Sequence, residues 1–497
     1  MGIKSVLAKP LAKLLQRRIY KWANEPKKTQ IKVFKSLMAQ AKHTTFGKDH
    51  NFDDIRNFED FSQKVPIRDY EDLKPYITQI MEGKSNVLWE GKPIYFAKTS
   101  GTTSGTKYIP LTKASLPHHM NAARNALLMY IAETGNANFV DGKLIFLQGS
   151  PIIGEKNGIK TGRLSGIVAH YVPKYLQKNR MPSWETNCIE DWETKVEAIV
   201  DETLKEDMTL ISGIPSWVQM YFEKIISKTG KAVSEVFPNF KLFVYGGVNF
   251  EPYRNKFEKM IGRKVDSIEL FPASEGFFAF QDRQDTRGML LLLNSGIFYE
   301  FIKSDDFFND KPKRFTVSDV ELGLNYVMII STNAGLWAYN IGDTVMFTSL
   351  KPHRIIVTGR IKHFISAFGE HVIAKEVEHA LEEAVKGTDI TVNEFTVAPQ
   401  TNPDRGLPYH EWFIEFEKEP SDLKEFINKV DLSMQEQNSY YLDLIKGKIL
   451  QQLKITKVNK NGFQSYMKSI GKLGGQNKVP RLSNDRKIAD ELKNYSS

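Results

Sequence analysis

Strand-like and helical segments alternate through the middle of the chain, and this alternation restricts the fold more than any other feature. Residues 141–150 (DGKLIFLQGS) and 207–215 (DMTLISGIP) are typical of buried strands, and residues 188–206 between them are typical of a helix. Residues 240–262 indicate a strand, a glycine turn and a helix, and residues 265–281 indicate a strand, an acidic turn and a strand. This order predicts an α/β domain.

Two of these predicted turns, at 245–247 and 271–276, follow strands, and ligands of α/β sheets bind beyond the carboxyl ends of strands. Glu275 stands in an otherwise apolar segment, where a carboxylate costs free energy of desolvation unless it is paired or holds a cation. Mg²⁺ would be a fitting cation beside phosphates, and Phe271 offers a flat face to adenine. A structural salt bridge for Glu275 and a core position for Phe271 are the alternatives.

Asp343 follows Gly342 at a turn between two strand-like runs, in GLWAYNIGDTVMFTS. An acid at the end of a strand can accept hydrogen bonds from both hydroxyls of a ribose. A Gly-Asp pair that only forms the turn is the alternative.

The run FAKTSGTTSGTKYIPLT, residues 96–112, combines glycines, hydroxyls and Lys107. Glycine lets the backbone approach a ligand closely, while hydroxyls and a lysine favour an anion, of which phosphate is the obvious candidate. A Walker A loop is excluded, because only three residues separate Gly101 from Gly105 and Tyr108 follows the lysine. An ordinary surface loop is the alternative, although strand-like segments flank the run on both sides.

The chain of 497 residues is too long for one hydrophobic core. We expect a large N-terminal domain over residues 1–357 and a smaller, mobile α/β domain over residues 358–497. The Gly359-Arg360 pair, between a strand-like run and the next helix, marks the expected junction.

Composition is that of a soluble globular protein, with 41% hydrophobic and 26% charged residues. The single cysteine, Cys188, cannot form an intrachain disulfide and suits a reducing cytoplasm. The sequence has no run of about 18 apolar residues and no secretory signal stretch at its start, so we expect a cytoplasmic protein without a transmembrane segment.

A basic amphipathic helix is predicted at the N-terminus. We expect this helix to pack on its own domain with its charges in water, and weak contact with an anionic membrane surface is the alternative. Its apolar residues at helical spacing are Leu7, Leu11, Leu14, Leu15, Ile19 and Trp22, and Lys9, Lys13, Arg17 and Lys21 lie elsewhere around the helix.

The net charge of +9 and the pI near 9.1 raise the question of nucleic-acid binding. Basic residues occur along the whole chain, interleaved with 59 acids, and neither a Cys/His finger spacing nor an RNP-like aromatic strand is present. We therefore expect no nucleic-acid partner, because a nucleotide substrate explains local positive charge equally well.

Five motifs, in order, resemble the adenylate-forming superfamily, and most closely the acyl acid amido synthetases of the Gretchen Hagen 3 (GH3) family. They are TSGTTSGTK, YGGVN, FPASEG, YNIGD and GRIKHFI, and the resemblance extends to NSYYLDLIKG and to GKLGGQNKVPRL. The resemblance implies the adenylate-forming fold and a two-step reaction. A carboxylic acid attacks the α-phosphate of ATP to give an acyl-adenylate and pyrophosphate, and an amino acid amine then displaces AMP to leave an amide.

The resemblance also implies roles for individual residues, with ATP and Mg²⁺ as the bound species. Glu275 would bind Mg²⁺, Asp343 would hold ribose, and Phe271, next to Ala273 and Ser274, would stack on adenine. Gly246 and Gly247 would let the backbone approach the adenine, Arg360 resembles the hinge arginine near ribose, and Lys478 resembles the lysine that a swinging C-terminal domain brings to the nucleotide. The β- and γ-phosphates would be held by Ser100, Gly101, Thr102, Thr103, Ser104, Gly105, Thr106 and Lys107.

The sequence departs from the plant members of the family in two places. Its first motif is shorter by one residue and one basic side chain, which leaves the phosphate partner of Lys107 open, and Phe271 stands where those enzymes have tyrosine. The compact length resembles bacterial members, so the acid preferences of the plant enzymes are not carried over.

The substrates and the proton acceptor of the second step do not follow from the sequence. We expect a monomer that acts on a small carboxylic acid and an amino acid, with the acyl pocket formed within residues 117–250. A ligase that makes a coenzyme A thioester and a non-catalytic nucleotide-binding protein are the rival interpretations. The histidines that could accept a proton, each more simply a surface or core residue, are His118, His119, His371 and His410.

Overall fold

The computed structural model describes residues 2–100, 106–172, 177–247, 250–361, 364–365, 367–368, 370, 372–447, 449–473 and 478–497. The chain forms two compact units: Met1–Val248 with Ile261–Ile356, and Asn249–Met260 with Val357–Ser497. The division into domains after residue 357 stays a prediction. The compact units divide one residue earlier in the sequence, and the segment 249–260 belongs to the second unit.

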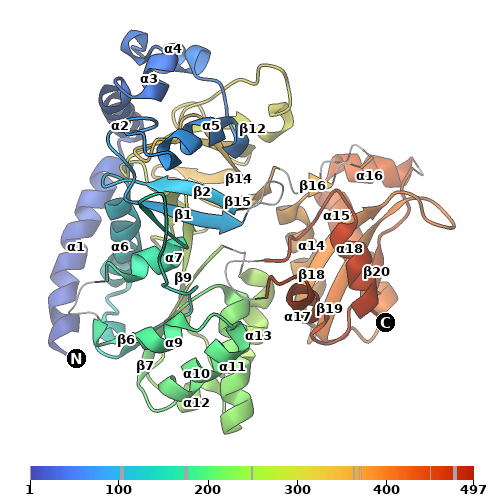
Figure 1. Ribbon diagram of the computed structural model, residues 1–497. Helices are drawn as coiled ribbons and strands as arrows, with labels where there is room; N and C mark the ends of the chain where they lie inside the picture. Colours follow the sequence, from blue (N-terminus) through green and yellow to red (C-terminus); the bar gives the residue numbers. More distant parts are fainter. Residues whose placement is uncertain are drawn as a thin grey trace. The chain divides into compact units, whose positions relative to one another are not determined.

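An eleven-stranded sheet forms the centre of the first unit (Figure 1). Five neighbouring strands are parallel: β6 (Arg180–Met181), β3 (Lys143–Phe146), β7 (Met208–Ser212), β8 (Leu242–Gly246) and β9 (Asp266–Ala273). The sheet continues in the order β10 (Gly276–Phe280), β11 (Met289–Leu291), β15 (His353–Arg360), β14 (Tyr339–Leu350), β13 (Asn325–Thr332) and β12 (Ile297–Lys303). The strands predicted in the middle of the chain are therefore present, and the α/β class is confirmed.

Helices connect and cover these strands. β7 and β8 are buried along most of their length, as is usual for parallel strands covered on both faces. Several helices begin at a side chain that accepts a backbone N–H, such as Asp191 before α10 (Trp192–Thr203) and Asp69 before α5 (Tyr70–Met81). The described helices of the first unit include α1 (Ile3–Ala23), α2 (Pro26–Ala41), α3 (Thr45–Asp49), α4 (Phe58–Lys64), α5, α6 (Leu116–Thr134), α7 (Leu164–Ala169), α9 (Trp184–Cys188), α10, α11 (Pro215–Thr229) and α12 (Val233–Val236).

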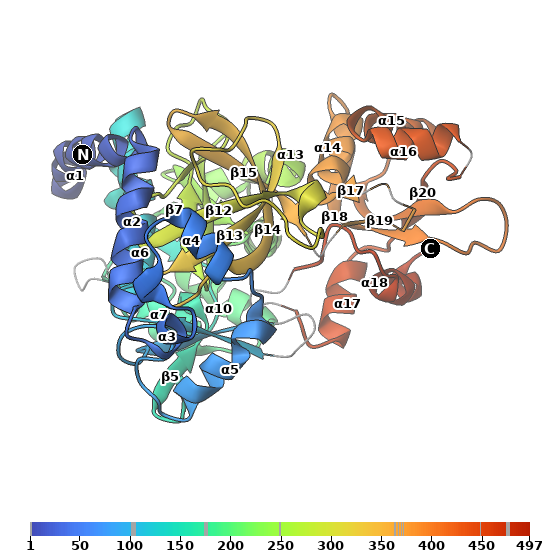
Figure 2. The ribbon, with the colours of Figure 1, turned by 90° about the horizontal axis from the view of Figure 1, so that it is seen from above.

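The N-terminal helix α1 (Ile3–Ala23) lies outside α6 (Leu116–Thr134), which packs on β9 and β10 (Figures 1 and 2). The prediction of a helix is confirmed, but the expectation that its leucines pack on the domain is wrong for Leu7, Leu11 and Leu14, which are 66%, 55% and 47% exposed. α1 instead turns a stripe of mostly small residues toward α6, which lets the two helices approach closely. That stripe contains Ser5, Ala12, Ile19 and Ala23, with Leu15 and Trp22 partly buried beside it.

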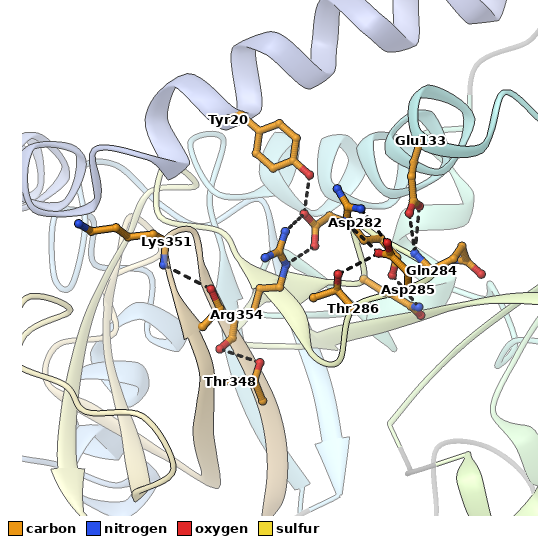
Figure 3. A network of polar contacts seen from close by, with 12 residues as sticks. Tyr20, Glu133, Asp282, Gln284, Asp285, Thr286, Thr348, Lys351 and Arg354 are labelled. Atoms are coloured by element: carbon orange, nitrogen blue, oxygen red, sulfur yellow. Dashed lines mark hydrogen bonds and ion pairs between the residues drawn. The ribbon is translucent and has the colours of Figure 1, made fainter.

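A polar network fixes the carboxyl-terminal end of α1 to the sheet (Figure 3). Arg354 of β15 donates to both oxygens of Asp282 at 2.8 Å, and the Tyr20 hydroxyl donates to Asp282 Oδ2 at 2.8 Å. Asp282 is 1% and Arg354 6% exposed. Burial and the Asp282 carboxylate both raise the pKa of Tyr20, so the hydroxyl keeps the proton that it donates.

A separate four-stranded sheet carries the glycine-rich run. Its order is β2 (Thr106–Leu111), β1 (Tyr95–Ser100), β5 (Ile159–Gly162) and β4 (Gly154–Lys156). β1 and β2 are the strands predicted on either side of the run, and β1 also pairs in parallel with β5.

The second unit is a three-stranded sheet with helices on both faces. β18 (Thr391–Gln400), β19 (Tyr409–Lys418) and β20 (Lys454–Lys457) form the sheet, and β16 (Phe364–Ile365) pairs with β17 (Val372–Ile373). Trp412 and Ile414 pack with helices α14 (Ala374–Val385), α15 (Leu423–Gln437) and α16 (Ser439–Lys446). Phe413 packs on the other face with α17 (Gly462–Ser469) and α18 (Lys487–Leu492).

The helix α13 (Glu251–Ile261) joins the second unit through a buried lysine. The Lys256 ammonium donates to Asn393 Oδ1 at 2.6 Å and pairs with the Glu417 carboxylate at 3.1 Å. Lys256 is only 4% exposed, so these two partners compensate its loss of hydration.

Candidate active site

The turns after β8 and β9 lie side by side at one edge of the large sheet. β8 and β9 are parallel and paired through Leu242↔Asp266 to Gly246↔Leu270, so their carboxyl ends are neighbours. β7 is parallel to β8 on the other side and ends at the same edge. Gly246, Gly247 and the acidic turn therefore lie toward the same edge, with Glu275 five residues beyond Leu270, the partner of Gly246.

Both glycines after β8 have a local structural reason. A Cβ at Gly246 would lie 2.5 Å from the carbonyl oxygen of Leu270 on β9, so no larger residue fits at this strand end. Gly247 has a φ of +86°, a conformation that side chains disfavour. The turn consequently exposes backbone rather than side chains to whatever lies beyond the sheet edge.

Glu275 occupies the tip of a tight hairpin. Gly276 of β10 pairs with Ala273 of β9, which leaves only Ser274 and Glu275 in the loop. Ser274 is buried and Glu275 is half-buried. The hairpin thus holds one carboxylate at the carboxyl edge of the parallel strands.

Phe271 is packed more deeply than a pure stacking platform would be. Its side chain is 7% exposed, and its ring meets that of Phe278 edge to face, with centroids 5.0 Å apart. This is the core position that the sequence left open as the alternative. Stacking on adenine remains a prediction.

The stem of the glycine-rich loop is well defined. Ser100 pairs with Thr106, and Thr99 pairs with Lys107. The Lys107 ammonium lies 5.4 Å from the centre of the Tyr70 ring, and the Tyr70 hydroxyl accepts a hydrogen bond from the Tyr108 amide at 2.9 Å. The predicted phosphate-binding residues Gly101, Thr102, Thr103, Ser104 and Gly105 lie outside the described residues.

The same sheet carries further lysines that sequence reasoning missed. Lys98 pairs directly with Tyr108, so both lie on the face opposite to that of Lys107. The Lys156 ammonium lies 4.4 Å from the centre of the Tyr108 ring. Lys98 lies within the run 96–112 but was not singled out there. Lys156 comes close to Tyr108 only through the β4–β5 hairpin, which no local sequence signal indicates.

Asp343 lies on a bulge of β14. Asn340 pairs with Ile329 and Thr344 pairs with Val327, so β14 has extra residues between these pairs. Within the bulge, Gly342 has a φ of +85° and its N–H donates to Asn340 Oδ1 at 2.8 Å. Asp343 is 9% exposed and belongs to the antiparallel part of the sheet, not to the β8–β9 edge.

Arg360 and Lys478 belong to the second unit. Arg360 ends β15 and is exposed. Lys478 is exposed and lies two residues before a firmly anchored segment, in which Pro480 accepts a hydrogen bond from Thr396 at 2.7 Å and Arg481 pairs with Glu378 at 3.3 Å. The described part of the structure thus divides the predicted site residues between the two units.

None of the candidate histidines that the structure describes lies in the turns after β8 and β9. His119 is 5% exposed on α6, and burial, with a smaller effect of His118, lowers its pKa to about 4. Burial also lowers the pKa of His118. His410 lies 2.8 Å from the Glu370 carboxylate inside the second unit, and His371 lies outside the described residues.

Among the residues with described positions, no group of three or more His, Cys, Asp or Glu side chains could hold a metal ion. Mg²⁺ does not require such a group, because it keeps several waters and binds through one or two carboxylates together with substrate phosphates. The carboxylate of Glu275, at the sheet edge, would supply one ligand and fits this manner of binding.

Comparisons with known sequences cover nearly the whole chain. The GH3 family N-terminal domain matches residues 15–188 and 177–265, the GH3 family central domain matches 290–360, and the GH3 family C-terminal domain matches 375–487. The jasmonoyl–L-amino acid synthetase JAR4 of Nicotiana attenuata is 22% identical over 85% of this chain and 85% of its own length. An indole-3-acetic acid-amido synthetase, GH3.3 of Arabidopsis thaliana, is 22% identical over 91% of this chain and 88% of its own length.

A solved structure with the same fold, described as GH3.15 acyl acid amido synthetase, covers 96% of this chain and 95% of its own, with a TM-score of 0.79 and 15% identity. A 2-hydroxyisobutyryl-CoA ligase covers 94% of this chain and 92% of its own, with a TM-score of 0.60 and 13% identity. The predicted adenylate-forming fold is confirmed. Over the described ranges, no helix has both the length and the apolar character needed to cross a bilayer.

Proposed function

The chain belongs to the GH3 family, and from this premise we propose that it is an ATP-dependent ligase that joins a carboxylic acid to the amine of an amino acid. The observation that carries the proposal is that Gly246, Gly247 and Glu275 lie toward the same edge of the sheet, in a chain that matches all three GH3 domains. The names of the similar proteins, jasmonoyl–L-amino acid and indole-3-acetic acid-amido synthetases, support an amide product.

In the first step the carboxylate of the substrate attacks the α-phosphorus of ATP. A bond forms between carboxylate oxygen and phosphorus, the bond from phosphorus to the β-phosphate oxygen breaks, and pyrophosphate leaves. The carboxylate is already ionised at pH 7, so this step needs no general base. Charge grows on the phosphate oxygens, and Lys107 and the backbone amides of the loop that follows β1 are proposed to stabilise it.

Glu275 is the proposed holder of Mg²⁺. When bound, the ion supplies positive charge to the phosphates and orients them. The hairpin fixes the backbone from which this carboxylate extends, because only two residues form its loop.

The nucleoside is the proposed ligand of five further positions. Asp343 would accept hydrogen bonds from the ribose hydroxyls, and Gly246 and Gly247 would allow adenine close to the backbone. Phe271 would stack on adenine. Arg360 and Lys478 are proposed to act from the second unit, Arg360 near the ribose and Lys478 at the phosphates.

In the second step the amine attacks the acyl carbon of the acyl-adenylate. The carbon–nitrogen bond forms, AMP leaves with the oxygen that came from the acid, and the amine gives up a proton. His119 and His410 are unsuitable acceptors because both are deeply buried. ATP use and the free cysteine Cys188 both fit a cytoplasmic enzyme.

A thioester-forming ligase is the second candidate, since the 2-hydroxyisobutyryl-CoA ligase has the same fold. Two measurements separate the candidates. Pyrophosphate release over a panel of aryl and aliphatic acids tests adenylation, and mass spectrometry after addition of either mixed amino acids or coenzyme A identifies the acceptor. We expect an N-acyl amino acid. A thioester as the sole product would overturn the amide assignment, and ATP binding without pyrophosphate release for any acid would indicate a non-catalytic protein.

A further inference from the structure

The positive excess of the chain is concentrated at its N-terminus. Residues 1–48 contain twelve Lys and Arg and one acid, Glu25, out of totals of 68 and 59, so the rest of the chain holds 56 basic and 58 acidic residues. The view that basic residues are simply interleaved with acids therefore fails for this segment. α1 alone carries six cations and no carboxylate: Lys4, Lys9, Lys13, Arg17, Arg18 and Lys21.

Two cations of α1, Arg18 and Lys21, share a face with exposed apolar side chains. Leu7, Leu11 and Leu14 are followed at the same helical spacing by Arg18 and Lys21, so these five residues form one stripe along the helix. All five are exposed, and Val6 beside them is 55% exposed. This exposed stripe lies on a different side of the helix from the buried one that contains Ala12 and Ile19.

α1 is held firmly enough to present this stripe in a fixed orientation. At its carboxyl-terminal end, Tyr20 joins the buried Asp282–Arg354 pair (Figure 3). At its start, the Gly2 N–H donates to the Asp141 carboxylate at 2.8 Å, and the Lys4 ammonium donates to Asn179 Oδ1 at 2.9 Å. The leucines are therefore exposed on an anchored helix.

We propose that the exposed stripe of α1 docks the protein on the surface of an anionic lipid bilayer. Leucines on a helix lying in the plane of the interface enter the boundary between headgroups and acyl chains, while lysines and arginines alongside them meet the anionic headgroups. A nucleic acid would neutralise the cations but offers no apolar region for three leucines. An acidic protein surface would likewise leave them in water unless it also supplied an apolar groove.

Vesicle co-sedimentation of the full chain tests this proposal. The protein should bind vesicles of phosphatidylcholine and phosphatidylglycerol (3:1), lose most binding on pure phosphatidylcholine, and bind less as salt rises. Leu7→Ser with Leu14→Ser should lower the partition coefficient at least about tenfold. Arg18→Gln with Lys21→Gln should lower it on anionic vesicles and weaken its salt dependence.

Matched controls keep the test specific. Leu322→Ser removes a leucine that is 56% exposed elsewhere in the first unit, and Lys231→Gln with Lys241→Gln removes two exposed cations. Both controls should bind vesicles as the wild type does, and all variants should keep their unfolding midpoint. Absence of vesicle binding, wild-type binding by both α1 variants, retention on duplex DNA without vesicle binding, or a dimer that Leu7→Ser with Leu14→Ser dissociates would each overturn the proposal.

Discussion

Single residues at the sheet edge divide into those that the backbone requires and those that the chemistry requires. Gly246 is explained by its contact with Leu270, whereas the carboxylate of Glu275, at the tip of the hairpin, is proposed to serve the chemistry.

Replacing Glu275 by glutamine should lower acid-dependent pyrophosphate release by about 100-fold or more, because the proposed Mg²⁺ ligand loses its charge. The unfolding midpoint should move by no more than about 2 °C, since the side chain is half-buried and nearly isosteric. Glu185→Gln, at an exposed position on α9, serves as the control and should leave both quantities unchanged. Wild-type rates in the Glu275 variant would remove the metal assignment.

His119 should make stability depend on pH. Burial lowers its pKa to about 4 from the ordinary 6.5. Between these two pH values the imidazole is therefore protonated in the unfolded chain and neutral in the folded chain. This contribution is fully present above pH 6.5 and is lost as pH falls toward 4, by up to about 3 kcal/mol. Urea unfolding at pH 7.0 and 4.5 should show the loss in the wild type and a smaller loss in His119→Asn. The exposed His43→Asn variant should follow the wild type, and equal losses in all three would contradict the account.

At the scale of elements, sequence reasoning succeeded where a pattern is local. β3, β7, β8 and β9 were predicted from short apolar runs, and their common edge follows because parallel strands share their carboxyl ends. It failed where a contact joins distant segments. Two features depend on tertiary packing. One is the pairing of β1 with β5, which adds Lys156 to the loop region, and the other is the burial of the face of α1 that contains Ala12.

The buried pair Asp282–Arg354 should be a major stabilising link between α1 and the sheet. Asp282→Ala leaves the Arg354 guanidinium without its carboxylate in a buried position, which should cost about 3–5 kcal/mol in urea unfolding. The neighbouring exposed pair Arg283–Asp285 provides the control, because water can replace that partner and Asp285→Ala should scarcely move the midpoint. Equal losses of stability in the two variants would show that burial does not determine the cost of removing the carboxylate.

At the scale of the whole molecule, the predicted site residues come from both compact units. The fold class and the family were recoverable from the sequence because the motifs are local and ordered. The residues proposed to hold the triphosphate keep their predicted roles, since Gly101 to Gly105 lie outside the described residues and Lys478 stands on an exposed segment of the second unit.

Lys478→Ala tests whether the second unit takes part in the chemistry. It should lower pyrophosphate release by about 100-fold, because it removes a charge proposed to act at the phosphates. Its unfolding midpoint should not change, since the side chain is exposed. Lys487→Ala, also exposed and nearby in the second unit, should retain full activity. Equal activities of the two variants would exclude the role of Lys478.

The most direct test for an acyl-adenylate intermediate traces the carboxylate oxygens of the acid into the products. A substrate acid with both carboxylate oxygens labelled as ¹⁸O should pass one label to AMP and keep one in the amide, because adenylation joins the acid to the α-phosphorus and acyl transfer breaks the carbon–oxygen bond. Mass spectrometry of the AMP should therefore show one ¹⁸O per turnover. Unlabelled AMP, or label in inorganic phosphate, would contradict an acyl-adenylate intermediate.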